Sequence, residues 1–235
     1  MESKKYTHIT PAILPKSFDD LVQHLERISS IAHSVQIDVV DGVFTNNKTW
    51  PYIQDHDGMF KKIVGQEEGL PYWETFDFEV DLMVSDPAFV ADQWIAAGAN
   101  RVIVHTRSIT KENLLKLASN VRDKGVEIYI GVELRTREKT KEYLTYITAE
   151  KGDISNVISG IQCMGISEVG FQHSPFNEEV LDMIREFKKE YPTLPISVDG
   201  GVTLDNAGEI YDAGAERLVS GSTVFESGDI RAVMN

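Results

Sequence analysis

Two segments far apart in the sequence each combine a β-branched run with aspartate and glycine. One reads Val-Gln-Ile-Asp-Val-Val-Asp-Gly over residues 35–42, and the other reads Ser-Val-Asp-Gly-Gly over residues 197–201. A strand of a parallel barrel delivers a catalytic carboxylate to the barrel rim in this way, with a tight turn beyond it. If Asp38 and Asp199 face each other across one mouth, they are suited to proton transfer on both faces of a small substrate.

The rest of the chain predicts the scaffold that would position these aspartates, because strand and helix patterns alternate along its length. Strands are expected at residues 8–14, 35–40, 76–84, 101–105, 126–134, 157–166, 196–199 and 218–220. Helices are expected at residues 18–28, 59–64, 87–98, 111–124, 138–150, 177–191 and 204–213, with a short last helix within 229–235. This order predicts an α/β fold in which residues 1–235 form a single (β/α)8 TIM barrel domain. A doubly wound open sheet is the alternative.

Composition limits the classes of function. The chain has 235 residues, a formal net charge of -14 and a pI of about 4.8, which argues against a nucleic-acid partner. No apolar run approaches the length of a membrane span, and the first residues lack the apolar stretch of a signal peptide. Cys163 is the single cysteine, so no internal disulfide can form. These features predict a cytoplasmic protein with no membrane partner.

Glycine-containing turns follow the last two expected strands. Asp-Gly-Gly at residues 199–201 and Ser-Gly-Ser at residues 220–222 lie where parallel barrels often bind a substrate phosphate through backbone N–H groups. Taken singly, each pair of residues can equally be read as a tight turn. Their placement after consecutive strands favours a phosphate site, and the acidic chain requires that local amides hold the phosphate.

Several ordered motifs together give the chain a resemblance to the ribulose-phosphate 3-epimerase family from the first strand to the last. The motifs are Pro-Ala-Ile-Leu at 11–14, Asp-Val-Val-Asp-Gly-Val-Phe at 38–44, Asp-Leu-Met-Val at 81–84, Gly-Phe at 170–171, Val-Asp-Gly-Gly-Val at 198–202 and Ser-Gly-Ser-Thr-Val-Phe at 220–225. The resemblance implies a barrel of the ribulose-phosphate-binding type and a small phosphorylated sugar as substrate. It also allows a homo-oligomer.

The resemblance implies roles for particular residues. Asp38 and Asp199 act as base and acid on opposite faces of the sugar C3 through an enediolate. The substrate and its phosphate are held by residues at the mouth of the barrel: Met83, Met164, Gly170, Gly200, Gly201, Gly221 and Ser222. Met83 and Met164 could pad the reacting centre, although methionines in barrel strands are usually core residues.

The chain departs from the family at the metal ligands. The family uses two histidines with the same two aspartates, and here Gln36 and Asp81 stand at the histidine positions. Gln36, Asp38, Asp81 and Asp199 would form an all-oxygen set for a divalent metal such as Mg, Mn or Zn, and oxygen ligands suit Mg²⁺, Mn²⁺ or Ca²⁺ better than Zn²⁺. The alternative is a site without metal, in which a loop cation such as Lys48 or Arg107 stabilises the enediolate.

Other residues leave further alternatives open. His105 ends the fourth strand and either lines the pocket or is held by packing, while His173 is a replacement ligand, a sugar contact or a solvated loop histidine. The function predicted is a sugar-phosphate 3-epimerase, an isomerase acting on ribulose 5-phosphate and xylulose 5-phosphate or a related ketose phosphate. The alternatives are a phosphosugar lyase or decarboxylase, whose Asp-x-Lys pattern is missing at residues 79–81, and an inactive phosphosugar-binding homologue.

Overall fold

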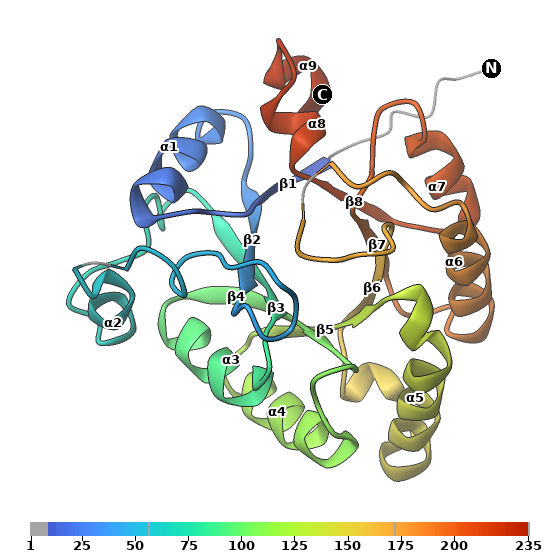
Figure 1. The fold of residues 1–235 in the computed structure, drawn as a ribbon. Helices are drawn as coiled ribbons and strands as arrows, with labels where there is room; N and C mark the ends of the chain where they lie inside the picture. The colour runs from blue at the N-terminus through green and yellow to red at the C-terminus, as the bar shows by residue number, and fades with distance from the viewer. Residues whose placement is uncertain (1–8, 56, 172, 235) are drawn as a thin grey trace.

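Eight parallel strands close into a barrel in the computed structural model, which describes residues 9–55, 57–171 and 173–234. Strands that follow one another in sequence are neighbours in the barrel, and β1 pairs with β8 to close it (Figure 1). The strands are β1 (Ile9–Ile13), β2 (Ser34–Val40), β3 (Asp77–Met83), β4 (Ala99–His105), β5 (Glu127–Val132), β6 (Gly160–Met164), β7 (Ile196–Asp199) and β8 (Arg217–Ser220). The predicted (β/α)8 TIM barrel is confirmed.

Helices surround the strands as a ring (Figure 1). They are α1 (Phe18–Ile28), α2 (Met59–Val64), α3 (Pro87–Ala96), α4 (Lys111–Asp123), α5 (Arg137–Lys151), α6 (Glu179–Glu190), α7 (Ala207–Ala213), α8 (Ser222–Phe225) and α9 (Ile230–Met234). The Ser17 side chain accepts a hydrogen bond from the Asp20 N–H and caps α1, and Leu21, Leu25 and Ile28 are buried beneath it. Among the described residues, no helix is both long and apolar enough to span a bilayer.

Several element bounds differ from the prediction, and one short helix was missed. The sixth strand was expected to begin at Val157, but a short 3₁₀ helix, η2 (Ile154–Asn156), precedes it and β6 begins at Gly160. The helix α8 was not expected, because four residues are too few to produce an amphipathic pattern.

The registers of the strands bring aspartates together. In the β2–β3 pair, Asp38 lies directly opposite Asp81, and in the β6–β7 pair Met164 lies opposite Asp199. Side chains alternate between the two faces of a strand, so Gln36 and Asp38 both point into the barrel interior. The interior of the barrel is therefore polar on β2, where a packed core would be apolar.

A buried ion cluster fills the opposite, amino-terminal end of the barrel. Glu79 on β3 is 4% exposed and receives Arg217 Nη2 from β8 at 2.5 Å, while Arg101 Nη1 on β4 lies 3.0 Å away from the same carboxylate oxygen. The Arg101 guanidinium also stacks over the Tyr129 ring at 4.3 Å. Because these side chains fill that end, the carboxyl ends of the strands are the side left for a ligand.

Asp41 fixes the turn that follows β2. One of its oxygens accepts hydrogen bonds from the backbone N–H groups of Val43 and Phe44, both at 2.8 Å, and the other accepts from Ser85 N–H at 2.7 Å. Asp41 therefore joins the loop after β2 to the loop after β3. Partial burial raises the pKa of Asp41, but the backbone hydrogen bonds outweigh burial and lower it.

Replacing Asp41 by Asn should lower the free energy of unfolding by about 1 kcal/mol at pH 7, because charge-assisted bonds to N–H groups are weakened. The stabilisation from the carboxylate is fully present above the pKa of an unfolded aspartate, about 3.9, and is lost as the pH falls through the lower folded-state pKa. Urea unfolding of both proteins between pH 7 and pH 3 measures this difference. A constant difference over that range, or an equal effect of Asn at the exposed Asp205, would contradict the assignment.

Candidate active site

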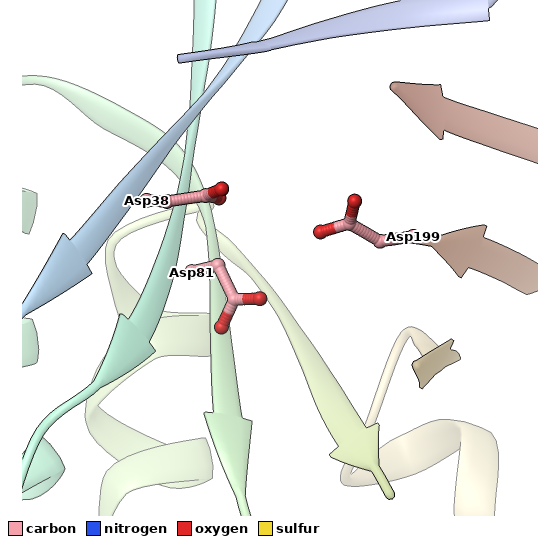
Figure 2. A group of neighbouring side chains, drawn as sticks. All are labelled: Asp38, Asp81 and Asp199. Atoms are coloured by element: carbon pink, nitrogen blue, oxygen red, sulfur yellow. The ribbon is translucent and has the colours of Figure 1, made fainter. Parts of the chain in front are cut away.

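Three aspartates from three strands meet inside the barrel mouth. Asp38 on β2, Asp81 on β3 and Asp199 on β7 each offer one carboxylate oxygen, and these oxygens all lie within 4.8 Å of one another. Figure 2 shows Asp38 and Asp81 on adjacent strands, with Asp199 reaching toward them from the other side. Their side chains are almost completely removed from solvent, with residue exposures of 4%, 0% and 7%.

Two glutamine amides hold this aspartate cluster together. Gln36 Nε2 donates to Asp38 Oδ1 and to Asp199 Oδ2, both at 2.7 Å. From β6, Gln162 Nε2 donates to Asp81 Oδ2 at 3.2 Å and to Asp199 Oδ2 at 3.4 Å. Buried carboxylates require such donors, because a buried charge without a partner is strongly destabilising. The sequence analysis did not identify Gln162. Its only signal there is a polar residue, two positions before Met164, in an otherwise apolar strand.

His105 completes the donors around Asp81. Its Nε2 lies 2.7 Å from Asp81 Oδ1, and the side chain is 1% exposed. Burial lowers the pKa of His105, but the adjacent Asp81 carboxylate outweighs burial, and the net shift is upward. The sequence left two roles open for His105, lining the pocket or being held by packing. In the structure its imidazole instead forms a hydrogen bond with the aspartate cluster.

The electrostatics of the cluster favour retention of protons. Burial raises the pKa of Asp38 well above its ordinary value, and the nearby Asp199 and Asp81 carboxylates raise it further. Burial likewise raises the pKa of Asp199 to about 7, with Asp81 adding to the shift and Gln36 opposing it. Carboxyl groups crowded in this way cannot all ionise together, so the cluster can hold one carboxylate and one carboxylic acid at neutral pH.

The donor set of the cluster fits a divalent cation that prefers oxygen. Asp38, Asp81 and Asp199 could each supply a carboxylate oxygen. Gln36 Oε1 is buried and has no hydrogen-bond partner among the described residues, and a half-turn of the amide would exchange it with Nε2 and direct it at the carboxylates. Such oxygen ligands match Mg²⁺ or Mn²⁺ better than Zn²⁺.

A cleft opens to solvent above the three aspartates. It is lined by the loops after β6, β7 and β8 and by the ends of β1, β2 and β3. The residues predicted to contact substrate all line this cleft: Asp38, Met83, Met164, Gly170, Asp199, Gly200, Gly201, Gly221 and Ser222. Gln36 and Asp81 do not line the cleft. They lie against its floor, where Gln36 donates to Asp38 and Asp81 contacts His105.

Glycine is required at the turn after β7. Gly201 has a φ of +67°, and a Cβ atom built on it would come within 2.7 Å of the backbone N and Cα of Phe176. A side chain at this position would therefore clash with the loop after β6 as well as strain the backbone. The absence of a side chain leaves the backbone of the turn accessible to the cleft.

The loop cations considered for a site without metal are engaged elsewhere. Arg107 Nη1 donates to Glu133 Oε2 at 3.2 Å, its Nη2 donates to the Phe44 carbonyl oxygen, and its guanidinium stacks 3.8 Å above the Phe44 ring. Lys48 extends over Gly42, where its side chain atoms would meet any added Cβ. Neither arrangement directs a positive charge at the aspartate cluster.

With this geometry established, comparison with known proteins places the chain in a family. The family model described as the ribulose-phosphate 3 epimerase family matches residues 8–225, and the chain belongs to this family. Among curated relatives, the cytoplasmic isoform of ribulose-phosphate 3-epimerase from Oryza sativa subsp. japonica is 27% identical over 220 residues, which is 92% of this chain and 86% of that protein. Ribulose-phosphate 3-epimerase from Helicobacter pylori strain J99 is 26% identical over 226 residues, covering 94% and 92%.

Solved structures show the same fold at much lower sequence identity. The 3-hexulose-6-phosphate synthase from Salmonella typhimurium superposes with a TM-score of 0.66 at 11% identity, covering 97% of this chain and 95% of that chain. The 3-keto-L-gulonate-6-phosphate decarboxylase from Vibrio cholerae gives a TM-score of 0.63 at 12% identity, covering 97% and 94%. These likenesses support the barrel architecture alone.

Replacing Asp199 by Asn should stabilise the protein in the presence of a metal chelator. The change removes one of three crowded, buried carboxyl groups while keeping a side chain of the same shape, and we expect a gain of about 1–2 kcal/mol at pH 8. Chemical denaturation in EDTA measures it. The same substitution at the exposed Asp123 serves as control, and a loss of stability in Asp199→Asn would show that the carboxylate is not under repulsion.

Proposed function

We propose that this protein is a sugar-phosphate 3-epimerase that interconverts ribulose 5-phosphate and xylulose 5-phosphate, or a closely related pair of ketose phosphates. The observation that carries the proposal is the placement of Asp38 and Asp199 on opposite sides of one cleft, where the same Gln36 amide donates to both at 2.7 Å. Membership of the family and the activity named for its curated relatives support the same reaction class.

Epimerisation at C3 needs a base on one face of the carbon and an acid on the other. In the proposed reaction one aspartate, as carboxylate, takes the C3 proton, and the electrons move into an enediolate. The other, as carboxylic acid, returns a proton to the opposite face, so the centre inverts. The raised pKa values of Asp38 and Asp199 support this division, because one of the two can remain protonated near neutral pH.

The enediolate carries negative charge that the site must stabilise. A divalent cation held by Asp38, Asp81 and Asp199 would supply positive charge beside the substrate oxygens. The chain's own residues fix those ligands: His105 and Gln162 hold the two oxygens of Asp81, and Gln36 holds Asp38 and Asp199 at a common distance. An oxygen-only set would make this a Mg²⁺ or Mn²⁺ site in place of the family's histidine-containing one.

The other end of the cleft suits the phosphate of a small sugar. Gly170, Gly201, Gly221 and Ser222 line it, and their backbone N–H groups are the donors that we assign to the phosphate. Three of these four positions are glycine, which allows close approach of the backbone to an anion. We also propose that the protein is located in the cytoplasm. Its similarity to the cytoplasmic isoform of ribulose-phosphate 3-epimerase supports this cellular location.

The reaction is tested by exchange of solvent deuterium into C3. Native protein incubated with ribulose 5-phosphate in D₂O should incorporate deuterium at C3 and form xylulose 5-phosphate, followed by NMR. Asp38→Asn and Asp199→Asn should each reduce the rate at least about 10³-fold, because each removes an acid–base group. Asp77→Asn, at the other end of β3, should retain the native rate.

The outcomes separate the candidate functions. Native protein that binds the sugar phosphate without exchange would overturn the epimerase proposal in favour of a binding homologue. Release of a one-carbon or two-carbon product in place of exchange would overturn it in favour of a lyase or decarboxylase.

The metal site is tested by direct binding. We expect Mn²⁺ to bind with a stoichiometry of one, measured by electron paramagnetic resonance, and Asp81→Asn to weaken binding by at least about tenfold, because the number of ligand charges sets cation affinity. Asp77→Asn is again the matched control. Equal affinity in Asp81→Asn and native protein would show that the cation is not held by the cluster.

A further inference from the structure

Gln162 on β6 reaches the aspartate cluster from the side of the barrel opposite to Gln36 on β2. It is 0% exposed, and a buried amide is destabilising unless its polar atoms have hydrogen-bond partners. Its Nε2 donates to Asp81 Oδ2 at 3.2 Å and to Asp199 Oδ2 at 3.4 Å. Gln36 Nε2 donates to the same Oδ2 of Asp199 at 2.7 Å. The two glutamines therefore act on one oxygen of Asp199.

Ser197 fixes the orientation of the Gln162 amide. The two residues are opposite each other in the β6–β7 register, and Ser197 is also 0% exposed. The Ser197 hydroxyl donates to Gln162 Oε1 at 3.1 Å. A half-turn of this amide would break that bond and direct Oε1 at two carboxyl groups, so Nε2 stays toward the acids. Gln36 differs, because its buried Oε1 has no hydrogen-bond partner among the described residues.

The two acid–base groups are supported unequally by these amides. Asp199 accepts at Oδ2 from both glutamines, and within the part of the chain that the structure describes no hydrogen bond reaches its Oδ1. Because Asp199 lines the cleft, Oδ1 is the oxygen that remains for proton transfer. The carboxyl group of Asp38 accepts from Gln36 alone among the described residues. Loss of the Gln162 amide would therefore disturb Asp199 and leave the support of Asp38 in place.

We propose that Gln162, anchored by Ser197, is a positioning residue that directs Asp199 Oδ1 at the C3 atom of the sugar. The inference rests on the proposed function and deepens it, because it assigns Gln162 to one of the two proton transfers. Gln162 does not line the cleft, so it acts through Asp199. If Gln36 turns its oxygen toward a cation, Gln162 is the amide donor that stays on Asp199.

This role predicts that the two epimers respond differently, because they present the C3 hydrogen to different aspartates. With one epimer, Asp38 takes the proton, the electron pair of the C3–H bond enters the enediolate, and Asp199 gives its own proton to the opposite face. When Asp199 is displaced, this second step slows, and Asp38 has time to exchange with D₂O and return a deuteron to the original face. That return labels the substrate without inversion. The other epimer starts at Asp199, so its first step slows and no such label appears.

The experiment starts separate reactions in D₂O from ribulose 5-phosphate and from xylulose 5-phosphate, and NMR measures deuterium at C3 in the recovered substrate and in the product. Gln162→Met keeps the length of the side chain and removes the amide. We expect its kcat to fall about tenfold with KM unchanged, because positioning is lost and binding is not. The ratio of deuterium in substrate to deuterium in product should rise for one epimer only. Ser197→Ala should change both quantities less, and the double variant no more than Gln162→Met, because Ser197 acts through Gln162.

A matched control separates positioning from a general loss of stability. Tyr143 Oη on α5 donates to the Ile109 carbonyl oxygen at 2.6 Å, so Tyr143→Phe removes a buried hydrogen bond outside the cluster and should keep the native deuterium ratios. If Gln162→Met does not fold, the deuterium ratios of Ser197→Ala decide.

The outcomes distinguish this role from the proposed function. Native deuterium ratios in Gln162→Met, an equal rise for both epimers, or additive losses with Ser197→Ala would overturn the role of Gln162, while exchange by native protein would leave the epimerase proposal intact. No exchange by native protein would overturn both proposals.

Discussion

Three carboxylates buried within 4.8 Å of one another are the constraint on which the rest of this structure depends. Burial and mutual repulsion each disfavour such a cluster, so the fold must surround it with donors. Gln36 and Gln162 supply amide N–H groups, and His105 supplies a ring nitrogen. These donors come from β2, β6 and β4. Because the closed barrel holds strands on all sides of the aspartates, it can supply the hydrogen bonds that stabilise the cluster.

The two ends of the barrel differ in how they accommodate buried charged groups. At the amino-terminal end, Glu79 and Glu127 are balanced by Arg101 and Arg217, which closes that end with a locally neutral ion cluster. At the mouth there is a small apolar cluster of buried side chains: Val40, Phe44, Met83, Met164, Ile166 and Val169. Three of them, Met83, Met164 and Ile166, line the same cleft as Asp38 and Asp199. Low polarity there strengthens every charge interaction in the cleft, including those that raise the pKa values of the aspartates.

Local patterns were sufficient to predict the barrel, most helix boundaries and the two aspartates at strand ends. A β-branched run followed by Asp-Gly is a local signal, and α1 was predicted from its cap and spacing alone. Gln162 and the partner of His105 could not be predicted, because each depends on which residue lies opposite across the barrel. The pairing of His173 with Glu226 joins residues 53 positions apart and has no sequence pattern either.

The replacement of two family histidines does not by itself argue for lost activity. Gln36 and Asp81 carry side-chain oxygens at the positions concerned, and Asp81 adds a third carboxyl group beside Asp38 and Asp199. A binding protein without turnover would gain stability by exchanging any of these for asparagine, since the neutral amide has the same shape and no repulsion. Retaining three repelling acids at the floor of a cleft has a physical reason only if proton transfer or a cation uses them.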